Sequence, residues 1–163
     1  VGTRGSVRTI TSQDLEEIGA DIILGNTYHL MLRPGEALIE EFGGIHGFAN
    51  WPRLVLTDSG GYQVFSLEPY VDDDGVEFKS TYDGSMHRLT PEKAVEIQIS
   101  LGSDIQMVLD VCPPIPAENG VVEMAVERTH QWAKRGRDHF LRIRDSGHSD
   151  KAQFGKMESE EAL

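Results

Sequence analysis

Cysteine is nearly absent from the sequence, since Cys112 is the single one among 163 residues. One thiol cannot form a disulfide within the chain, and this scarcity is typical of proteins in a reducing compartment. No segment approaches the ~18 consecutive apolar residues that a membrane-spanning helix needs, and the sequence opens without a basic leader followed by an apolar run. We therefore expect a cytoplasmic protein that does not associate with membranes.

Basic residues are also scarce relative to acidic ones. The chain has 15 Lys and Arg against 27 Asp and Glu, a formal net charge of −12. Such a balance argues against a general affinity for nucleic-acid phosphates, but it leaves room for a local basic patch. With 39% hydrophobic and 26% charged residues, the composition is that of a globular chain rather than a disordered one. At this length we expect one domain, or part of one.

Several motifs that would assign a chemistry are missing. Neither GxGxxG nor GxxxxGK[ST] occurs, so the common phosphate-binding loops are not supported. The six histidines and Cys112 show no spacing typical of a zinc site. Ser59 lacks the preceding glycine of a nucleophile elbow. The sequence thus predicts no metal site in this chain and argues against a hydrolase triad.

Hydrophobic patterning predicts alternating strands and helices. Short apolar runs bounded by polar or glycine residues predict buried strands over 21–26, 54–57 and 105–109. Capping residues and amphipathic spacing predict helices over 12–19, 34–42, 91–101 and 117–140. This order predicts a parallel sheet. Alternating segments at 64–67, 76–79 and 87–89 predict an antiparallel insertion of hairpins between the second strand and the third helix.

Polar side chains follow each of the three predicted parallel strands, at Asn26, Asp58 and Asp110. Barrels of the α/β class build their active sites at this end of their strands. A carboxylate there can act as a base or nucleophile, or accept hydrogen bonds from a ligand. The alternative is that both aspartates only cap turns. The Gly60-Gly61 pair favours a ligand site, because glycine lets a ligand approach the backbone closely.

Two further residues near these strand ends have alternative interpretations. Tyr62 could stack on a nucleobase, worth ~1–3 kcal/mol per base, or could pack as an ordinary aromatic residue. Cys112 could be a reactive thiol or a small wall residue of a pocket. Because no basic residue lies near it in sequence, the wall residue is favoured.

Six segments resemble, in order, the motifs of the tRNA-guanine transglycosylase family. They are GNTYHL at 25–30, LRPG at 32–35, DSGGYQ at 58–63, LTPEK at 89–93, LGSDI at 101–105 and DVCPP at 110–114. The resemblance covers roughly residues 1–140. Cys112 with the following two prolines is similar to the bacterial branch of the family.

The resemblance implies a fold and an activity. The fold is α/β, of the TIM (β/α)8-barrel family, with residues 1–155 as an incomplete N-terminal part that carries an antiparallel β-hairpin insertion. We expect residues 156–163 to form a disordered acidic tail. The implied reaction exchanges the wobble guanine of a tRNA with a G-U-N anticodon for a 7-deazaguanine, the prequeuosine base, through a covalent enzyme–tRNA intermediate. The implied partners are this tRNA, guanine, the prequeuosine base and, for the full-length form, a second copy in a homodimer.

The same resemblance implies roles for individual residues. Asp58 matches the general base that acts on the incoming heterocycle, Tyr62 the aromatic residue that stacks on it, and Asp110 the carboxylate that recognises its N–H edge. Cys112 matches a thiol that lines the pocket. The remaining matches are polar residues at or supporting the pocket, namely Ser59, Gln63, Asn26, Thr27 and His29.

The sequence also departs from the family pattern. Val111 stands where the family motif carries an acid. The segment Ala152–Gly155 resembles the onset of a fourth barrel strand, but its expected continuation is replaced by Lys156-Met157-Glu158. The family's nucleophile and its structural zinc, with its ligands, belong to a region that this chain does not contain, so no cofactor is expected within it. The alternative function is a truncated, catalytically inactive paralogue that serves as a base-binding or assembly partner.

Overall fold

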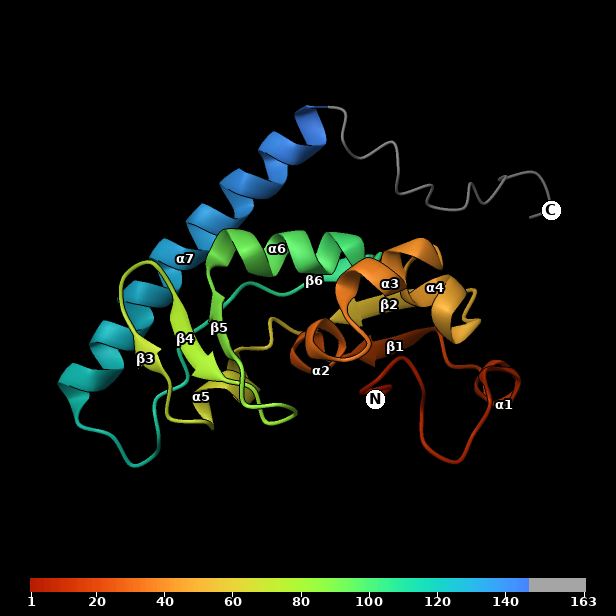
Figure 1. The fold of residues 1–163 in the computed structure, drawn as a ribbon, viewed down its shortest axis with the longest axis horizontal. Coiled ribbons are helices and arrows are strands. Elements are labelled where there is room, and N and C mark those ends of the chain that lie inside the picture. The colour runs from red at the N-terminus through yellow and green to blue at the C-terminus, as the bar shows by residue number, and fades with distance from the viewer. Residues whose placement is uncertain (147–163) are drawn as a thin grey trace.

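Two three-stranded sheets organise residues 1–146, the part of the chain that the computed structural model describes (Figure 1). The parallel sheet has the order β1-β2-β6, with β1 at Ile22–Gly25, β2 at Leu54–Thr57 and β6 at Ile105–Gln106. The antiparallel sheet has the order β3-β4-β5, with β3 at Tyr70–Val71, β4 at Val76–Lys79 and β5 at Met86–Leu89. An α/β chain with a parallel sheet and an antiparallel hairpin insertion is therefore confirmed.

Seven helices connect and cover these strands within the described residues. They are α1 (Ser12–Glu17), α2 (Thr27–Leu32), α3 (Glu36–Glu41), α4 (Gly44–Ala49), α5 (Gly61–Phe65), α6 (Pro91–Ser100) and α7 (Asn119–Asp145). Capping residues determine where two of these helices begin. Thr11 forms a capping box with Asp14 before α1, and Thr90 caps α6 ahead of Pro91. No helix of residues 1–146 combines the length and the hydropathy that crossing a membrane would require.

The parallel sheet has one covered and one open face. Ile23 and Val55 lie in the buried core, and α3, α4 and α6 lie on one side of this sheet (Figure 1). The register pairs Ile22 with Leu54, and Leu56 with Ile105. Ile22, Leu54 and Ile105 are 44%, 49% and 41% exposed. The alternation along each strand therefore leaves an apolar face of the sheet open to solvent.

A buried amide fixes how β6 meets the rest of the sheet. Gln98 on α6 is fully buried, and its Oε1 accepts from the Thr57 hydroxyl and from the Met107 backbone N–H. Its Nε2 donates to the backbone carbonyls of Ala94 and Met107. All the hydrogen-bonding groups of the amide are thus used inside the core, as burial requires. The predicted strand over 105–109 is wrong beyond Gln106, because the Met107 backbone bonds to this side chain and β2 ends at Thr57.

The prediction of a strand at 64–67 is also wrong. Val64 lies in α5, which begins after Gly60 at a φ of +80° and carries the hydrogen bond from the Val64 N–H to the Gly60 carbonyl. The first strand of the insertion is instead β3. Helices α2 and α4 were not predicted, and α7 runs further than the predicted 117–140. The other predicted helices and strands are confirmed to within a few residues.

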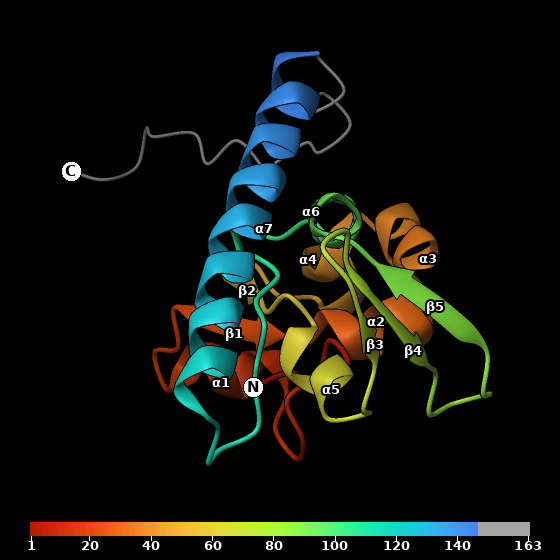
Figure 2. The same ribbon diagram turned by 90° about the vertical axis from the view of Figure 1, so that its left-hand side faces the viewer.

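The antiparallel sheet is attached to α7 through the acidic turn between β3 and β4, which contains Asp72, Asp73 and Asp74 (Figure 2). Asp73 pairs with Arg128 at 2.8 Å, and its backbone carbonyl accepts from the buried Trp132 indole at 2.8 Å. Arg135 donates to the same carbonyl and forms a two-pronged pair with Glu92 on α6. Fixed arginine forks of this kind hold geometry well. The insertion, α6 and α7 are therefore locked together.

The last predictions about the chain's end, the strand onset at 152–155 and the disordered tail at 156–163, lie outside the described residues.

Candidate functional site

The carboxylate of Asp58 is held by three donors at the end of β2. Its Oδ1 accepts the backbone N–H groups of Thr27 at 2.9 Å and Gly60 at 3.1 Å, and its Oδ2 accepts the side-chain amide of Asn26. Two of these donors lie directly after the adjacent parallel strand, because Asn26 follows β1 and Thr27 is the first residue of α2. The Thr27 hydroxyl also donates to the Asp58 backbone carbonyl. The structure thus fixes an acceptor at the carboxyl end of the sheet.

Asp110 lies next to this group and is joined to it by the turn after β2. The Ser59 hydroxyl donates to Asp110 Oδ1 at 3.2 Å and accepts the Gly61 backbone N–H at 3.1 Å. A Cβ on Gly61 would lie only 2.9 Å from Asp110 Oδ1 and 3.1 Å from the Asp110 carbonyl. Any larger residue at position 61 would therefore require Asp110 to shift. The three predicted strand-end residues, Asn26, Asp58 and Asp110, are brought into one cluster.

The single thiol belongs to the same cluster. Cys112 Sγ donates to Asp110 Oδ2 at 3.3 Å. Burial raises the pKa of Cys112 from its ordinary 9.0 to about 11, with the hydrogen bond to Asp110 and the charge of that carboxylate as further causes. A thiol with such a pKa stays protonated near neutral pH and is a poor nucleophile. The raised pKa therefore argues against a reactive thiol, and the role of Cys112 as a wall residue of a pocket stays a prediction.

Two neighbouring side chains on α5 differ in their exposure. Tyr62 is 74% exposed, so its ring is open for stacking. The Oε1 atom of Gln63 is buried and has no hydrogen-bond partner within residues 1–146. Buried acceptors are rarely left unpaired in proteins. Both residues follow Gly61 directly, so the turn that carries Asp58 and Ser59 also positions them.

His29 extends the site toward residues that the sequence did not indicate. Its Nδ1 lies 2.9 Å from the Tyr82 hydroxyl oxygen, and Arg4 donates to that oxygen at 2.9 Å. Burial lowers the pKa of His29, the nearby Arg4 cation lowers it further, and Asp58 opposes both. Arg4 and Tyr82 are 78 residues apart in the sequence, so no local pattern could have paired them.

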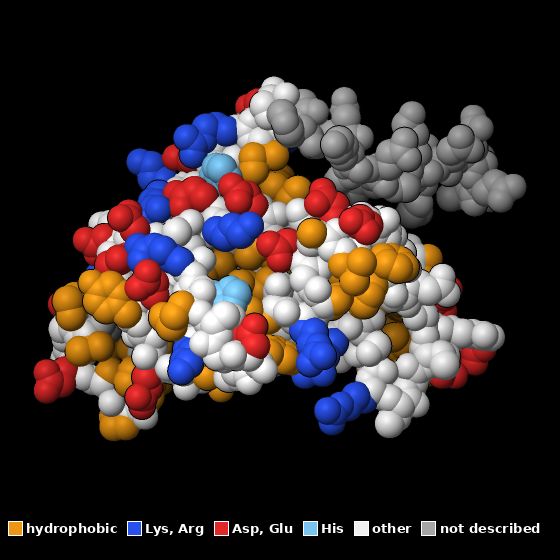
Figure 3. All heavy atoms as spheres, in the orientation of Figure 1, with side chains coloured by type: hydrophobic (Ala, Val, Ile, Leu, Met, Phe, Trp, Pro, Cys, Tyr) orange, Lys and Arg blue, Asp and Glu red, His pale blue; other side chains and the backbone are white. Residues whose placement is uncertain are grey.

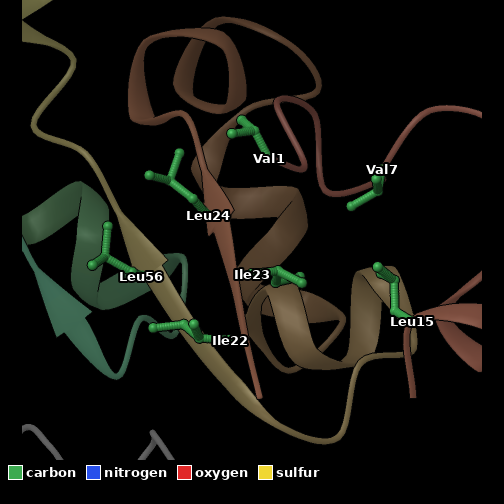
Figure 4. Close-up of a pocket in the computed structure, with 7 residues that line it drawn as sticks. All are labelled: Val1, Val7, Leu15, Ile22, Ile23, Leu24 and Leu56. Carbon is green, nitrogen blue, oxygen red and sulfur yellow. The ribbon is translucent and has the colours of Figure 1, made fainter. Parts of the chain in front are cut away.

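The most evident hollow of the surface is elsewhere. It measures about 280 Å³, lies beside β1 and is lined by apolar side chains (Figure 4). Its lining residues are Val1, Val7, Leu15, Ile22, Ile23, Leu24 and Leu56. None of the residues of the Asp58–Asp110 cluster lines it. Because no polar side chain lines it, this hollow lacks the side-chain groups that usually orient a ligand in a specific binding site.

Charges on the face that carries α6 and α7 are mixed rather than uniformly basic (Figure 3). Lys93 pairs with Glu36 at 3.4 Å, and His139 pairs with Glu96 at 2.9 Å. In the part of the chain that the structure describes, no cluster of three or more His, Cys, Asp or Glu side chains could hold a metal ion. The zinc that the family implies therefore has no fitting donor set in residues 1–146.

The cluster can perform acid–base chemistry and recognise planar N–H donors. Asp58 offers a fixed acceptor, Asp110 offers a second one, and Tyr62 offers an open ring beside them. These features define an α/β protein with a cluster of hydrogen-bonded carboxylates near the carboxyl ends of its parallel strands, where proteins of this class build their active sites.

Comparison with known proteins identifies the family of this chain. The family model described as TGT, queuine tRNA-ribosyltransferase, matches residues 1–158. The chain therefore belongs to the queuine tRNA-ribosyltransferase family, which confirms the resemblance drawn from its motifs.

Curated relatives agree with this assignment. A queuine tRNA-ribosyltransferase of Caldanaerobacter subterraneus subsp. tengcongensis is 57% identical over 139 residues, which are 84% of this chain and 37% of the relative. Its counterpart from Bacillus licheniformis is 53% identical over 137 residues, 83% of this chain and 36% of the relative. The relative from Listeria monocytogenes serotype 4b is 49% identical over 160 residues, which are 97% of this chain and 42% of the relative. The chain thus spans about two fifths of the length of the relatives that it matches.

Proposed function

We propose that this chain carries the base-handling part of a tRNA-guanine transglycosylase. The reaction exchanges guanine at the wobble position of a tRNA with a G-U-N anticodon for the prequeuosine base, through a covalent enzyme–tRNA intermediate. The observation that carries the proposal is the hydrogen-bonded turn from Asp58 to Gly61, which joins the Asp58 carboxylate at the end of β2 to the Asp110 carboxylate in the segment after β6. Relatives named queuine tRNA-ribosyltransferase at 49–57% identity support it.

Each carboxylate then has its own task. Asp110 accepts hydrogen bonds from the N–H edge of the bound heterocycle, while Ser59 and the Cys112 thiol hold its two oxygens in place. Asp58 serves as general base toward the incoming heterocycle, and its backbone and amide donors keep it oriented. Tyr62 stacks on the ring plane from its exposed position.

Other polar residues support this arrangement. Asn26 and Thr27 orient Asp58. Gln63 follows Tyr62 on α5, with its Oε1 buried and unpaired within residues 1–146, and His29 contacts the Tyr82 hydroxyl. We further propose that a chain of the relatives' length folds as a (β/α)8 barrel, works as a homodimer and supplies the nucleophile and the zinc ligands outside this chain. No step proposed for the described residues requires a metal.

Base binding to the chain itself tests the assignment of Asp110. Guanine and the prequeuosine base are titrated calorimetrically into the wild type and Asp110→Ala. Without Asp110, the buried N–H donors of the base lose their acceptor, and the expected cost is ~1–3 kcal/mol or more. Asp138→Ala is the matched control, because Asp138 lies on α7 and pairs only with the adjacent Arg137 among the described residues. Equal affinity of the Asp110→Ala variant and the wild type would refute the assignment.

A further inference from the structure

Three side chains from separate segments meet at one hydroxyl group beside the site. The Tyr82 hydroxyl, from the loop between β4 and β5, lies 2.9 Å from an Arg4 guanidinium nitrogen and 2.9 Å from His29 Nδ1. The Arg4 guanidinium also lies over the Tyr82 ring, at 5.4 Å from its centroid. His29 lies two residues after Thr27, whose backbone N–H donates to the Asp58 carboxylate.

The donors and acceptors that these groups possess determine which atom carries each proton. Arginine has donors and no acceptor, so the Tyr82 oxygen accepts from Arg4. The single Tyr82 O–H remains available to donate, and His29 Nδ1 is the acceptor within reach. A ring nitrogen that accepts a hydrogen bond carries no proton, so a neutral His29 has its proton on Nε2. In the competing arrangement both Arg4 and a protonated Nδ1 donate to Tyr82, whose own hydrogen then has no partner among these groups.

We propose that Arg4 and Tyr82 are positioning residues that hold His29 as its Nε2–H tautomer, so that this N–H is a donor to an oxygen atom of the bound substrate. Nε2 makes no hydrogen bond within residues 1–146 and is not among their buried unpaired atoms, so it is open to an incoming acceptor. Only the identity of that acceptor rests on the proposed function, since the tautomer follows from the three side chains alone.

The charges around His29 are consistent with a neutral ring. Burial and the Arg4 cation lower its pKa, and Asp58 across the start of α2 acts in the opposite direction. Tyr82 faces Nδ1, and the Tyr28 ring packs edge-on at 5.1 Å between centroids. A charged ring would carry a proton on both nitrogens and would lose the Tyr82 donation.

Nitrogen-15 NMR of histidine-labelled protein at neutral pH tests the tautomer directly, with His29→Asn used to assign the signals. We expect a protonated Nε2 and an unprotonated Nδ1 in the wild type. Tyr82→Phe removes the donor and Arg4→Ala frees the hydroxyl oxygen, so each is expected to shift the population toward the Nδ1–H form. Matched controls are Tyr70→Phe and Arg8→Ala, whose exposed side chains make no hydrogen bond within the described residues.

Two results would overturn the positioning role: an Nδ1–H tautomer in the wild type, or an unchanged tautomer population in both Tyr82→Phe and Arg4→Ala. The donor role is tested by titrating a G-U-N anticodon stem-loop RNA. His29→Gln, whose amide reaches the Nε2 position, should retain affinity, whereas His29→Asn should lose about tenfold. Equal RNA affinity of wild type, His29→Gln and His29→Asn would overturn the donor role. A failure of the proposed function itself appears separately, as absent base binding in the Asp110 titration.

Discussion

The reactivity of Cys112 reports on the Asp110 carboxylate without requiring turnover. Because the chain has one cysteine, thiol–disulfide exchange with the neutral reagent 4,4′-dithiodipyridine measures this site alone. The pKa of Cys112 is raised from 9.0 to about 11 by burial, by its hydrogen bond to Asp110 and by the charge of that carboxylate. The thiolate fraction at about pH 8 is therefore roughly 100-fold lower than that of an ordinary thiol.

Intrinsic nucleophilicity partly offsets this loss. The exchange rate of a thiolate rises with its pKa with a slope of about 0.4–0.5, so a two-unit increase recovers roughly a factor of eight. We expect exchange at about pH 8 to be roughly tenfold slower than for the urea-unfolded chain, before any slowing from restricted access. The rate should rise with pH and level off only near the pKa of about 11.

Asp110→Asn removes the charge beside the thiol and is expected to lower the pKa of Cys112 and accelerate exchange at about pH 8. Ser59→Ala is the matched control, because Ser59 bonds the other Asp110 oxygen and leaves the carboxylate beside the thiol. Stopped-flow pH–rate profiles of the three proteins provide the comparison. An inflection near 9 in the wild type, or superimposable profiles for wild type and Asp110→Asn, would refute the described geometry.

Two other substitutions test the site and the scaffold. Gly61→Ala would place a methyl group 2.9 Å from Asp110 Oδ1, so the affinity for guanine measured by calorimetry should fall. Gly120→Ala is the control and should leave the affinity unchanged, because its Cβ meets nothing within 4 Å. Equal affinities of the two variants would contradict the close packing of the turn against Asp110. Trp132→Ala removes a fully buried indole and its hydrogen bond to the Asp73 carbonyl, and should lower the free energy of unfolding in urea by about 3–5 kcal/mol. A loss below ~1 kcal/mol would mean that α7 is not anchored through this residue.

The sequence predicted the strand ends well because burial imposes a local pattern there. Short apolar runs before Asn26, Asp58 and Asp110 identify the three strands and the edge at which they meet, although β6 itself ends at Gln106. The parallel pairing of β1 with β2 and of β2 with β6 follows from the intervening helices. The sequence therefore predicts that the three residues lie together.

Non-local hydrogen bonds account for what the sequence could not predict. After β6 ends at Gln106, the Met107 backbone bonds to the Gln98 amide as well as to the Thr57 carbonyl of β2. Val64 continues an alternating pattern, yet Gly60 at positive φ opens a helical turn there. Arg4 reaches Tyr82 across 78 residues. Each case requires the tertiary arrangement, which periodicity alone does not encode.

Guanine exchange by a chimera tests the central claim most directly. Residues 1–146 of this chain replace the matching residues of the Caldanaerobacter subterraneus relative, and incorporation of radiolabelled guanine into a G-U-N tRNA is measured. We expect exchange by the chimera, and a loss of about 10²–10⁴-fold in Asp58→Asn as expected for removal of a general base, with Asp138→Asn unchanged. A folded chimera without exchange beside an active parent, or full activity in Asp58→Asn, would contradict the account.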